Sequence, residues 1–358
     1  LSATDDFSVL SEVDTINIAV PTPLRKTKDP DISYIVAALK EIKEYLHKGQ
    51  LIILESTTYP GTTEEVMLPI LEETGLKVGK DFYLAFSPER VDPGNEQFTT
   101  KNIPKVVGGV TPACTEFAAM LYSAAGMNPV PVSSTRVAET VKLLENTFRS
   151  VNIGLVNEIA MMCNRMGINV WEVIDAAATK PFGFMPFYPG PGLGGHCIPI
   201  DPFYLSWKAK QSGFDARFIE LAGMINGDMP GYVVTRVSEA LNTRKKCLNG
   251  SKILVMGVSY KKDIDDTRES PAYDIIRLLH KMGAEIYWND PFVEELEEES
   301  GFAERLEYDS AKVSEMDCAI IITGHTKVDY STLVEGCPLI FDARNVLKDF
   351  DSDSIVTM

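Results

Sequence analysis

Cys197 stands out among the side chains of this sequence because it closes a loop of glycine and proline. The loop reads Gly190-Pro191-Gly192-Leu193-Gly194-Gly195-His196-Cys197. Glycine lets a backbone approach a ligand closely, and proline restricts the loop to few shapes. A cysteine at the end of such a loop is presented to a ligand, where its thiolate is a nucleophile. The alternative is an ordinary buried thiol, which suits the other five cysteines better.

Two further interpretations of this loop are rejected. Gly190, Gly192 and Gly195 have the spacing of a dinucleotide-binding fingerprint, but residues 182–189 before them do not form a buried strand. His196 is adjacent to Cys197, and consecutive side chains diverge, so we expect no cysteine–histidine protease pair.

Three polar residues are candidates to act beside the thiol. Asp201 follows Cys197 by four residues and precedes Pro202, so it is a helix N-cap, a carboxylate beside the sulfur, or both. Lys142 and Asn146 are four residues apart and therefore share one face of a helix. Spacing alone favours a solvated helix surface for these two.

A basic cluster follows the first strand of the C-terminal region. Tyr260-Lys261-Lys262 is followed by Asp263, Asp265, Asp266 and Arg268. Lysine and arginine at a strand end suit phosphate groups. The alternative is a cluster of surface salt bridges.

The N-terminal elements predict how such residues are positioned. Apolar runs predict strands at 15–20, 51–54, 82–86 and 129–132, with helices at 32–46, at 63–73 and from Thr111 onward. Strands that alternate with helices form a parallel sheet, whose ligands lie at the strand C-terminal ends. The polar loops at Thr22, Ser56-Thr57 and Glu89 fall at such ends.

The middle of the chain is predicted to be helical. Residues 136–166 carry a continuous apolar stripe, which suits a domain spine or a dimer interface. Further helices are expected at 171–178 and over 202–242, with breaks near Gly213 and Pro230-Gly231. A second α/β region follows residues 242–252. The predicted domains are 1–133, 134–242 and 243–358, and the fold class is α/β with two Rossmann-like sheets joined by a helical domain.

Composition excludes several classes of protein. The 358 residues carry a net charge of −17 without a basic stripe, so we expect no nucleic-acid partner. No apolar run approaches twenty residues, and no signal peptide is evident, so a soluble protein without a membrane partner is expected. The six scattered cysteines contain no Cys-x-x-Cys pair, which predicts a cytoplasmic setting and no bound metal.

With these pieces placed, the chain resembles the nucleotide-sugar 6-dehydrogenases, the UDP-glucose and GDP-mannose dehydrogenase family. The matching stretches occur in the family's order and cover nearly the whole chain: Val20-Pro21-Thr22-Pro23, Glu55-Ser56-Thr57, Ser87-Pro88-Glu89-Arg90, Lys142 to Asn146, Gly194-Gly195-His196-Cys197 with Asp201, Lys261 to Ser270, and Phe341-Asp342-Ala343-Arg344. Two runs, Gly194 to Pro202 and Thr57 to Thr62, are most similar to the UDP-N-acetylglucosamine 6-dehydrogenase branch, with the UDP-N-acetylmannosamine enzymes as close neighbours.

The resemblance implies a four-electron oxidation of the sugar C6 alcohol to a carboxylate with two NAD. Cys197 would form a thiohemiacetal and then a thioester that water hydrolyses. Lys142 and Asn146 would stabilise the oxyanion, while Glu89 and Asp201 would assist proton transfer and the hydrolytic water. The resemblance further implies cofactor contacts from Pro21, Thr22, Ser56, Thr57 and Arg268, and substrate contacts from Arg90, Tyr188, Gly194, Lys261 and Arg344. The long helix would carry the interface of a homodimer or a higher homo-oligomer.

The sequence departs from the family in two places. The first βαβ unit, with its phosphate-binding glycines and ribose-binding acid, is absent, so we expect these residues alone to bind NAD weakly. Pro93 stands where the UDP-glucose branch has an acidic residue, so the cofactor contact of that position is not expected here.

Two other functions remain open. A two-electron hydroxyacid dehydrogenase shares the Lys-x-x-x-Asn helix, but Cys197 argues against it. A non-catalytic nucleotide-sugar binding protein is the other alternative, and the presence of Cys197, Lys142, Glu89 and Asp201 argues against it.

Overall fold

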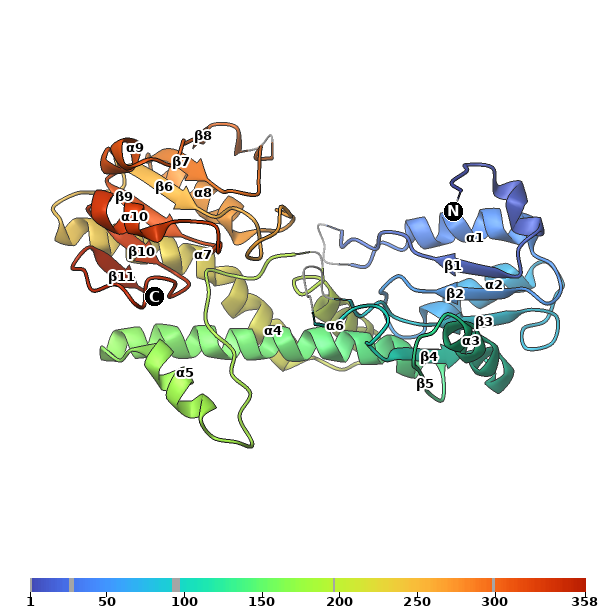
Figure 1. Cartoon of the computed structure of the whole chain (residues 1–358). Coiled ribbons are helices and arrows are strands. Elements are labelled where there is room, and N and C mark those ends of the chain that lie inside the picture. Colours follow the sequence, from blue (N-terminus) through green and yellow to red (C-terminus); the bar gives the residue numbers. More distant parts are fainter. Residues whose placement is uncertain (1, 26–28, 92–96, 196, 298–299) are drawn as a thin grey trace. The chain divides into compact units, whose positions relative to one another are not determined.

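The structure, a computed structural model, describes residues 2–25, 29–91, 97–195, 197–297 and 300–358 (Figure 1). Pro93 and His196 therefore lie outside the described residues. The chain forms two compact units: Leu1–Phe148 with Ile200–Ala216, and Arg149–Pro199 with Arg217–Met358.

The first unit is built on a five-stranded sheet with the order β1-β2-β3-β4-β5. Its strands are β1 (Thr15–Ile18), β2 (Leu51–Leu54), β3 (Tyr83–Phe86), β4 (Lys105–Gly109) and β5 (Pro129–Pro131). The first three strands are parallel, as predicted. Strand β4 was not predicted from the sequence, and it is antiparallel to β3. Parallel neighbours need a crossover connection, usually a helix, and the described residues between β3 and β4 contain none.

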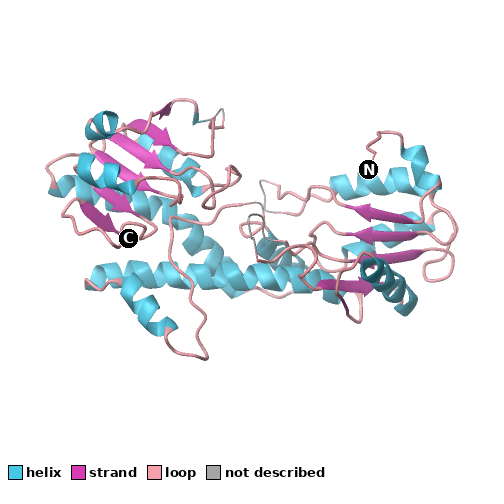
Figure 2. Ribbon diagram, in the orientation of Figure 1, coloured by secondary structure: helices cyan, strands magenta, loops and turns pink. Residues whose placement is uncertain are grey.

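Strand β2 explains how this sheet is buried. All four of its residues are apolar and buried, and successive side chains point to opposite faces. Ile52 and Leu54 pack in the cluster that contains the buried side of α1 (Ser33–Tyr45). Leu51 and Ile53 pack in the cluster that contains α3 (Pro112–Ala124). Helices therefore cover both faces of the sheet, as expected for continuous apolar strands (Figure 2).

The remaining helices of this unit are short. They are η1 (Phe7–Ser11), the wide-turn helix η2 (Thr63–Met67), α2 (Leu68–Glu72) and α6 (Asp201–Gln211). The predicted helix at 63–73 therefore corresponds to η2 and α2 together.

The long helix predicted at 136–166 is α4 (Thr135–Met166), which extends from the first unit into the second. Helices α5 (Val170–Ala178) and α7 (Arg217–Thr243) follow in the second unit. The break predicted at Pro230 was wrong, because α7 is continuous through that residue. Met229, Val233 and Val237 around the proline are fully buried, and this packing offsets the lost hydrogen bond.

The second unit contains a six-stranded sheet that is parallel throughout. Its strands are β6 (Lys252–Met256), β7 (Glu285–Asn289), β8 (Glu304–Arg305), β9 (Cys318–Ile321), β10 (Ile340–Asp342) and β11 (Ile355–Thr357). The order β11-β10-β9-β6-β7-β8 is that of a complete Rossmann sheet. The predicted fold class is confirmed, although the short elements β8, β11, α9 (Ser310–Ser314) and α10 (Tyr330–Gly336) were not predicted.

The strand order reverses between β6 and β9, and ligands of doubly wound sheets bind at such a switch point. The loops after these two strands touch through their backbones. Gly257 has φ +77°, and a Cβ atom there would lie 2.2 Å from the carbonyl oxygen of Thr323. Only glycine fits this close approach. Next in the chain, α8 (Pro271–Lys281) begins at its predicted cap Ser270.

Within the described residues, no helix has the length and apolar character needed to cross a membrane.

Candidate active site

The first unit brings Asn146 and Asp201 together. Asn146 Nδ2 donates a hydrogen bond of 2.5 Å to Asp201 Oδ2, and both residues are buried. The solvated-surface interpretation is therefore wrong for Asn146, whereas Lys142 is half-buried. The N-cap interpretation of Asp201 is also wrong, since Ile200 is the cap and Asp201 begins α6. The carboxylate bonds to α4 instead of capping its own helix.

Burial controls the ionisation of Asp201. It raises the pKa of this carboxyl to about 6, against the opposing effects of the Asn146 hydrogen bond and the Lys142 charge. A carboxyl with such a pKa exchanges protons near neutral pH, as a general acid or base must.

The predicted cofactor residues of the first unit lie at one edge of its sheet. Strands β1, β2 and β3 are paired in register at their last residues, Ile18, Leu54 and Phe86. The segments around Pro21, Thr22, Ser56 and Thr57 follow the first two of these strand ends.

Two of these residues hold the edge together. Ser56 Oγ bonds to both the amide and the carbonyl of Val20, each at 2.8 Å. Thr22 is buried, and its carbonyl accepts the hydroxyl of Tyr204 from α6. Thr57 remains half-exposed.

Glu89 is paired with a lysine that was not predicted as a site residue. Lys105 Nζ lies 3.1 Å from Glu89 Oε2 and 3.5 Å from Glu55 Oε1, with its side chain only 7% exposed. Tyr122 donates its hydroxyl to the same oxygen of Glu55. A charged residue that enters the buried run of β4 was the only signal for Lys105.

The charge of Lys105 matters for Glu89. Partial burial opposes ionisation of Glu89, but Lys105 and the amides of Val91 and Arg90 outweigh it and lower the pKa of the carboxyl. Glu89 is therefore an anion at neutral pH. The neighbouring Arg90 binds Glu145 of α4, with 2.6 Å between Nη2 and Oε1, and the carbonyl of Pro104.

Cys197 lies in the second unit and is exposed. Its loop is seated on the segment that leads into α8: the amide of Gly195 donates to the carbonyl of Arg268 at 3.0 Å. A Cβ atom at Gly194 would lie 2.6 Å from Cβ of Tyr260, so this glycine permits close packing of the two segments. The buried-thiol interpretation of the other cysteines fails for Cys247, which is exposed.

Arg268 places a positive charge near the thiol. Its guanidinium bonds to Asp266, with 2.6 Å between Nη2 and Oδ2. This ion pair agrees with the alternative interpretation of the basic cluster as surface salt bridges. This bond is the main reason that the pKa of Arg268 is raised, and the thiolate of Cys197 contributes in the same direction.

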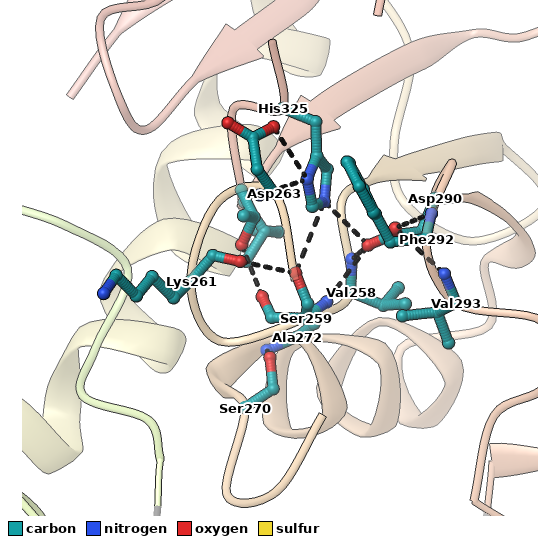
Figure 3. Close-up of polar contacts among 12 residues, drawn as sticks. Val258, Ser259, Lys261, Asp263, Ser270, Ala272, Asp290, Phe292, Val293 and His325 are labelled. Atoms are coloured by element: carbon teal, nitrogen blue, oxygen red, sulfur yellow. Dashed lines mark hydrogen bonds and ion pairs between the residues drawn. The ribbon is translucent and has the colours of Figure 1, made fainter. Parts of the chain in front are cut away.

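The predicted substrate residues of the second unit have distinct surroundings. Arg344 donates from Nε to the carbonyl of Ile322 at 2.8 Å, and burial lowers its pKa to about 10, so it is charged at neutral pH. Tyr188 stacks on Trp171 and donates its hydroxyl to Asp175 at 2.7 Å. Lys261 lies in the switch-point loop after β6, with its side chain directed away from the polar cluster beneath (Figure 3).

A cavity of about 680 Å³ lies elsewhere in the first unit, between α3 and the segment after β5. Its lining includes Thr115, Met120 and Val132 but none of the predicted site residues. Cavity size therefore does not identify the site.

Three domains of one protein family match the chain. They are the NAD binding domain, the central domain and the UDP binding domain of the UDP-glucose/GDP-mannose dehydrogenase family, at residues 1–125, 136–228 and 254–349.

Individual relatives agree with this match. The chain is 39% identical to a UDP-N-acetyl-D-glucosamine 6-dehydrogenase of Pseudomonas aeruginosa, over 82% of the chain and 69% of that protein. A UDP-D-ManNAc dehydrogenase structure from Pyrococcus horikoshii has a TM-score of 0.88 at 34% identity, covering 99% of the chain and 83% of that structure. An NDP-N-acetyl-D-galactosaminuronic acid dehydrogenase structure from Methanosarcina mazei Go1 has a TM-score of 0.84 at 32% identity, covering 99% and 78%.

Proposed function

The chain belongs to the UDP-glucose/GDP-mannose dehydrogenase family and is an NAD-dependent nucleotide-sugar dehydrogenase. From this premise we propose that it oxidises a UDP-N-acetylhexosamine, with UDP-N-acetylglucosamine favoured, at C6 to the uronate. The exposed thiol of Cys197, on a loop seated beside Arg268, is the observation that carries this proposal. A two-electron alcohol oxidation needs no such nucleophile.

The thiol explains how oxidation passes beyond the aldehyde. The Cys197 thiolate adds to the C6 aldehyde and gives a thiohemiacetal, and loss of a hydride from C6 leaves a thioester. Water adds to that acyl carbon, the sulfur leaves, and the carboxylate is released. In balance, one alcohol, one water and two NAD⁺ give one carboxylate, two NADH and three protons.

Four residues of the first unit are proposed to assist. Lys142 and Asn146 stabilise the oxyanion of the tetrahedral intermediates, since a charged and an amide donor suit developing negative charge. Asp201 exchanges a proton near neutral pH, while Glu89 stays ionised and acts as base for the hydrolytic water. Chain connectivity supports a shared role, because four residues span at most about 14 Å between Cys197 and Asp201.

The residues present fit the part of NAD that lies beyond parallel strand ends. The aligned ends of β1, β2 and β3 form such an edge, which Ser56 and Thr22 stiffen through backbone contacts. Pro21, Thr22, Ser56 and Thr57 are the proposed binding residues there, with Arg268 contributing from the second unit. When bound, NAD accepts the two hydrides.

The UDP moiety is proposed to bind the Rossmann sheet of the second unit. Lys261 follows β6 and Arg344 follows β10, so both cations belong to loops at strand C-terminal ends. Arg90, Tyr188 and Gly194 are proposed to complete the substrate contacts. Residues 1–133, 134–242 and 243–358 would then serve the cofactor, the chemistry and the nucleotide sugar, respectively.

Product analysis tests the function. The protein would be offered UDP-N-acetylglucosamine, UDP-N-acetylmannosamine and UDP-N-acetylgalactosamine with NAD, and NADH and uronate would be quantified. We expect two NADH per uronate and the highest kcat/KM for UDP-N-acetylglucosamine. One NADH per sugar with an aldehyde product would contradict the proposal, and a preference for another epimer would contradict only the substrate assignment.

We also propose that a second copy of the chain covers the outer face of α4. Leu144, Phe148, Leu155, Met162 and Met166 are exposed along this helix at spacings of four or seven residues. A long exposed apolar stripe marks an interaction surface.

A further inference from the structure

A buried polar cluster lies beneath the switch-point loops of the second unit (Figure 3). Ser259 follows β6, Asp290 follows β7 and His325 follows β9, and their exposures are 0%, 0% and 1%. Polar groups buried to this degree destabilise a fold unless they are hydrogen-bonded, so their partners show what the cluster holds.

Asp290 is the anionic centre of the cluster. Its Oδ2 accepts the amides of Val258 and Ser259, at 2.7 and 3.1 Å, and Nε2 of His325 lies 2.9 Å away. Its Oδ1 accepts two further amides, from Phe292 and Val293. Burial alone would raise the pKa of Asp290, but these donors, with His325 foremost, lower it.

The surroundings of His325 define its tautomer. Nδ1 accepts the amide hydrogen of Asp263 at 3.0 Å, so this nitrogen carries no proton. The proton therefore lies on Nε2, which faces Asp290 at 2.9 Å and the hydroxyl of Ser259 at 3.3 Å. Because serine and aspartate face the same nitrogen, the cluster is not a Ser-His-Asp nucleophile, which uses opposite nitrogens.

The cluster fixes the backbone on both sides of Lys261. Before Lys261, Ser259 Oγ lies 3.3 Å from Nε2 of His325 and also donates to the carbonyl of Lys261 at 2.8 Å. On the other side, the amide of Asp263 is held by His325, and the side chain of Asp263 accepts the amide and hydroxyl of Thr326 at 2.8 and 2.9 Å. The loop after β6 is thus tied to the loop after β9 at two points around one lysine.

We propose that His325 is a positioning residue for the nucleotide diphosphate: its neutral imidazole holds the loop so that Lys261 is presented to the phosphates. This inference rests on the proposed function, in which Lys261 contacts the diphosphate. The ammonium group of a lysine is a point charge on a flexible stem. The position of the Lys261 backbone therefore determines how closely this charge can approach a bound phosphate.

Calorimetry with UDP on the full chain tests this role. His325→Gln keeps a polar group near Nε2 but loses the acceptor for Asp263, and His325→Asn keeps an acceptor near Nδ1 but loses the bond to Asp290. Each should weaken UDP binding by about tenfold, the equivalent of one lost hydrogen bond. His280→Gln is the matched control, since His280 belongs to the same unit but stacks on Phe302. It should leave the affinity unchanged.

A double-mutant cycle separates positioning from general stabilisation. If His325 acts through Lys261, then His325→Gln should weaken UDP binding little further once Lys261→Ala is present. Full additivity, or unchanged UDP affinity at a temperature where the His325 variants are folded, would overturn the inference. If the His325 variants bind UDP as tightly as the unaltered chain does, the inference fails but the proposed function stands. No UDP binding by the unaltered chain would overturn both.

Discussion

Asn146 and Asp201 join α4 to the first residue of α6 through a buried hydrogen bond of 2.5 Å. The bond holds a carboxyl group that burial makes reluctant to ionise. This group should therefore contribute to the pH dependence of stability.

Asp201→Asn should stabilise the fold at neutral and basic pH. The folded pKa is raised from 3.8 to about 6, so the folded state prefers the protonated group. The associated stability is complete below pH 4 and is lost as pH rises through 6. The substitution should thus gain up to about 3 kcal/mol at pH 8, taking about 1.4 kcal/mol per pKa unit, and almost nothing at pH 4. Urea unfolding at several pH values measures this. Asp215→Asn, at an exposed site, is the control, and an equal gain at all pH values would disprove the account.

Lys105→Met should shift the acidic limb of the pH–rate profile. Lys105 lowers the pKa of Glu89, so its removal should let that pKa rise. Glu89 would then become protonated at higher pH, so on acidification uronate formation should fail at a higher pH than in the unaltered protein. The exposed Lys101→Met is the control. If the acidic limb of the profile does not shift, then Glu89 is not the base or Lys105 does not lower its pKa.

Cys197→Ala should abolish uronate formation, because the second hydride must leave from a covalent adduct. A slow first oxidation to the aldehyde should persist. Cys197→Ser should form an ester that hydrolyses more slowly than the thioester, so mass spectrometry should find the protein carrying the sugar nucleotide. Cys247→Ser changes the other exposed cysteine and should form uronate at a near-normal rate. Near-normal uronate production by Cys197→Ala would exclude the covalent route.

Lys261→Ala should raise KM for the UDP-sugar by roughly ten- to a hundredfold, since a charged hydrogen bond to phosphate contributes about 1.5–3 kcal/mol. The exposed neighbour Lys262 gives the control variant Lys262→Ala. Steady-state kinetics that show the same KM for both variants would remove Lys261 from the site.

Leu155→Glu should dissociate the expected dimer, because it places a charge in the exposed stripe of α4. Light scattering of the protein as it elutes from a size-exclusion column would measure the mass of the oligomer. Arg149→Glu, which is exposed on α4 outside that stripe, should leave the mass unchanged. A monomeric unaltered protein would contradict the proposed interface directly.

Some of these features follow from the sequence and others depend on tertiary packing. The apolar run of β2 and the stripe of α4 predicted their elements, because burial on two faces or on one face leaves a clear pattern. The pattern around Pro230 failed because buried neighbours outweighed the local preference of proline.

The residues of the candidate site also divide into those that the sequence predicts and those that depend on tertiary packing. Cys197 could be found from its loop, and the motif residues from their resemblance to a family. Lys105 and His325 could not, because each becomes meaningful only when strands distant in sequence bring it to a partner.

Gly257 limits how the nucleotide-sugar site can be altered. What opposes a side chain at this position is the carbonyl of Thr323, a main-chain atom that no change of neighbouring side chains can remove. Selection for new sugar nucleotides should therefore leave this contact intact and alter side chains at the rim. A library that randomises Gly257 would yield mostly inactive protein, whereas one directed at exposed loop residues would retain the scaffold on which a changed preference can be built.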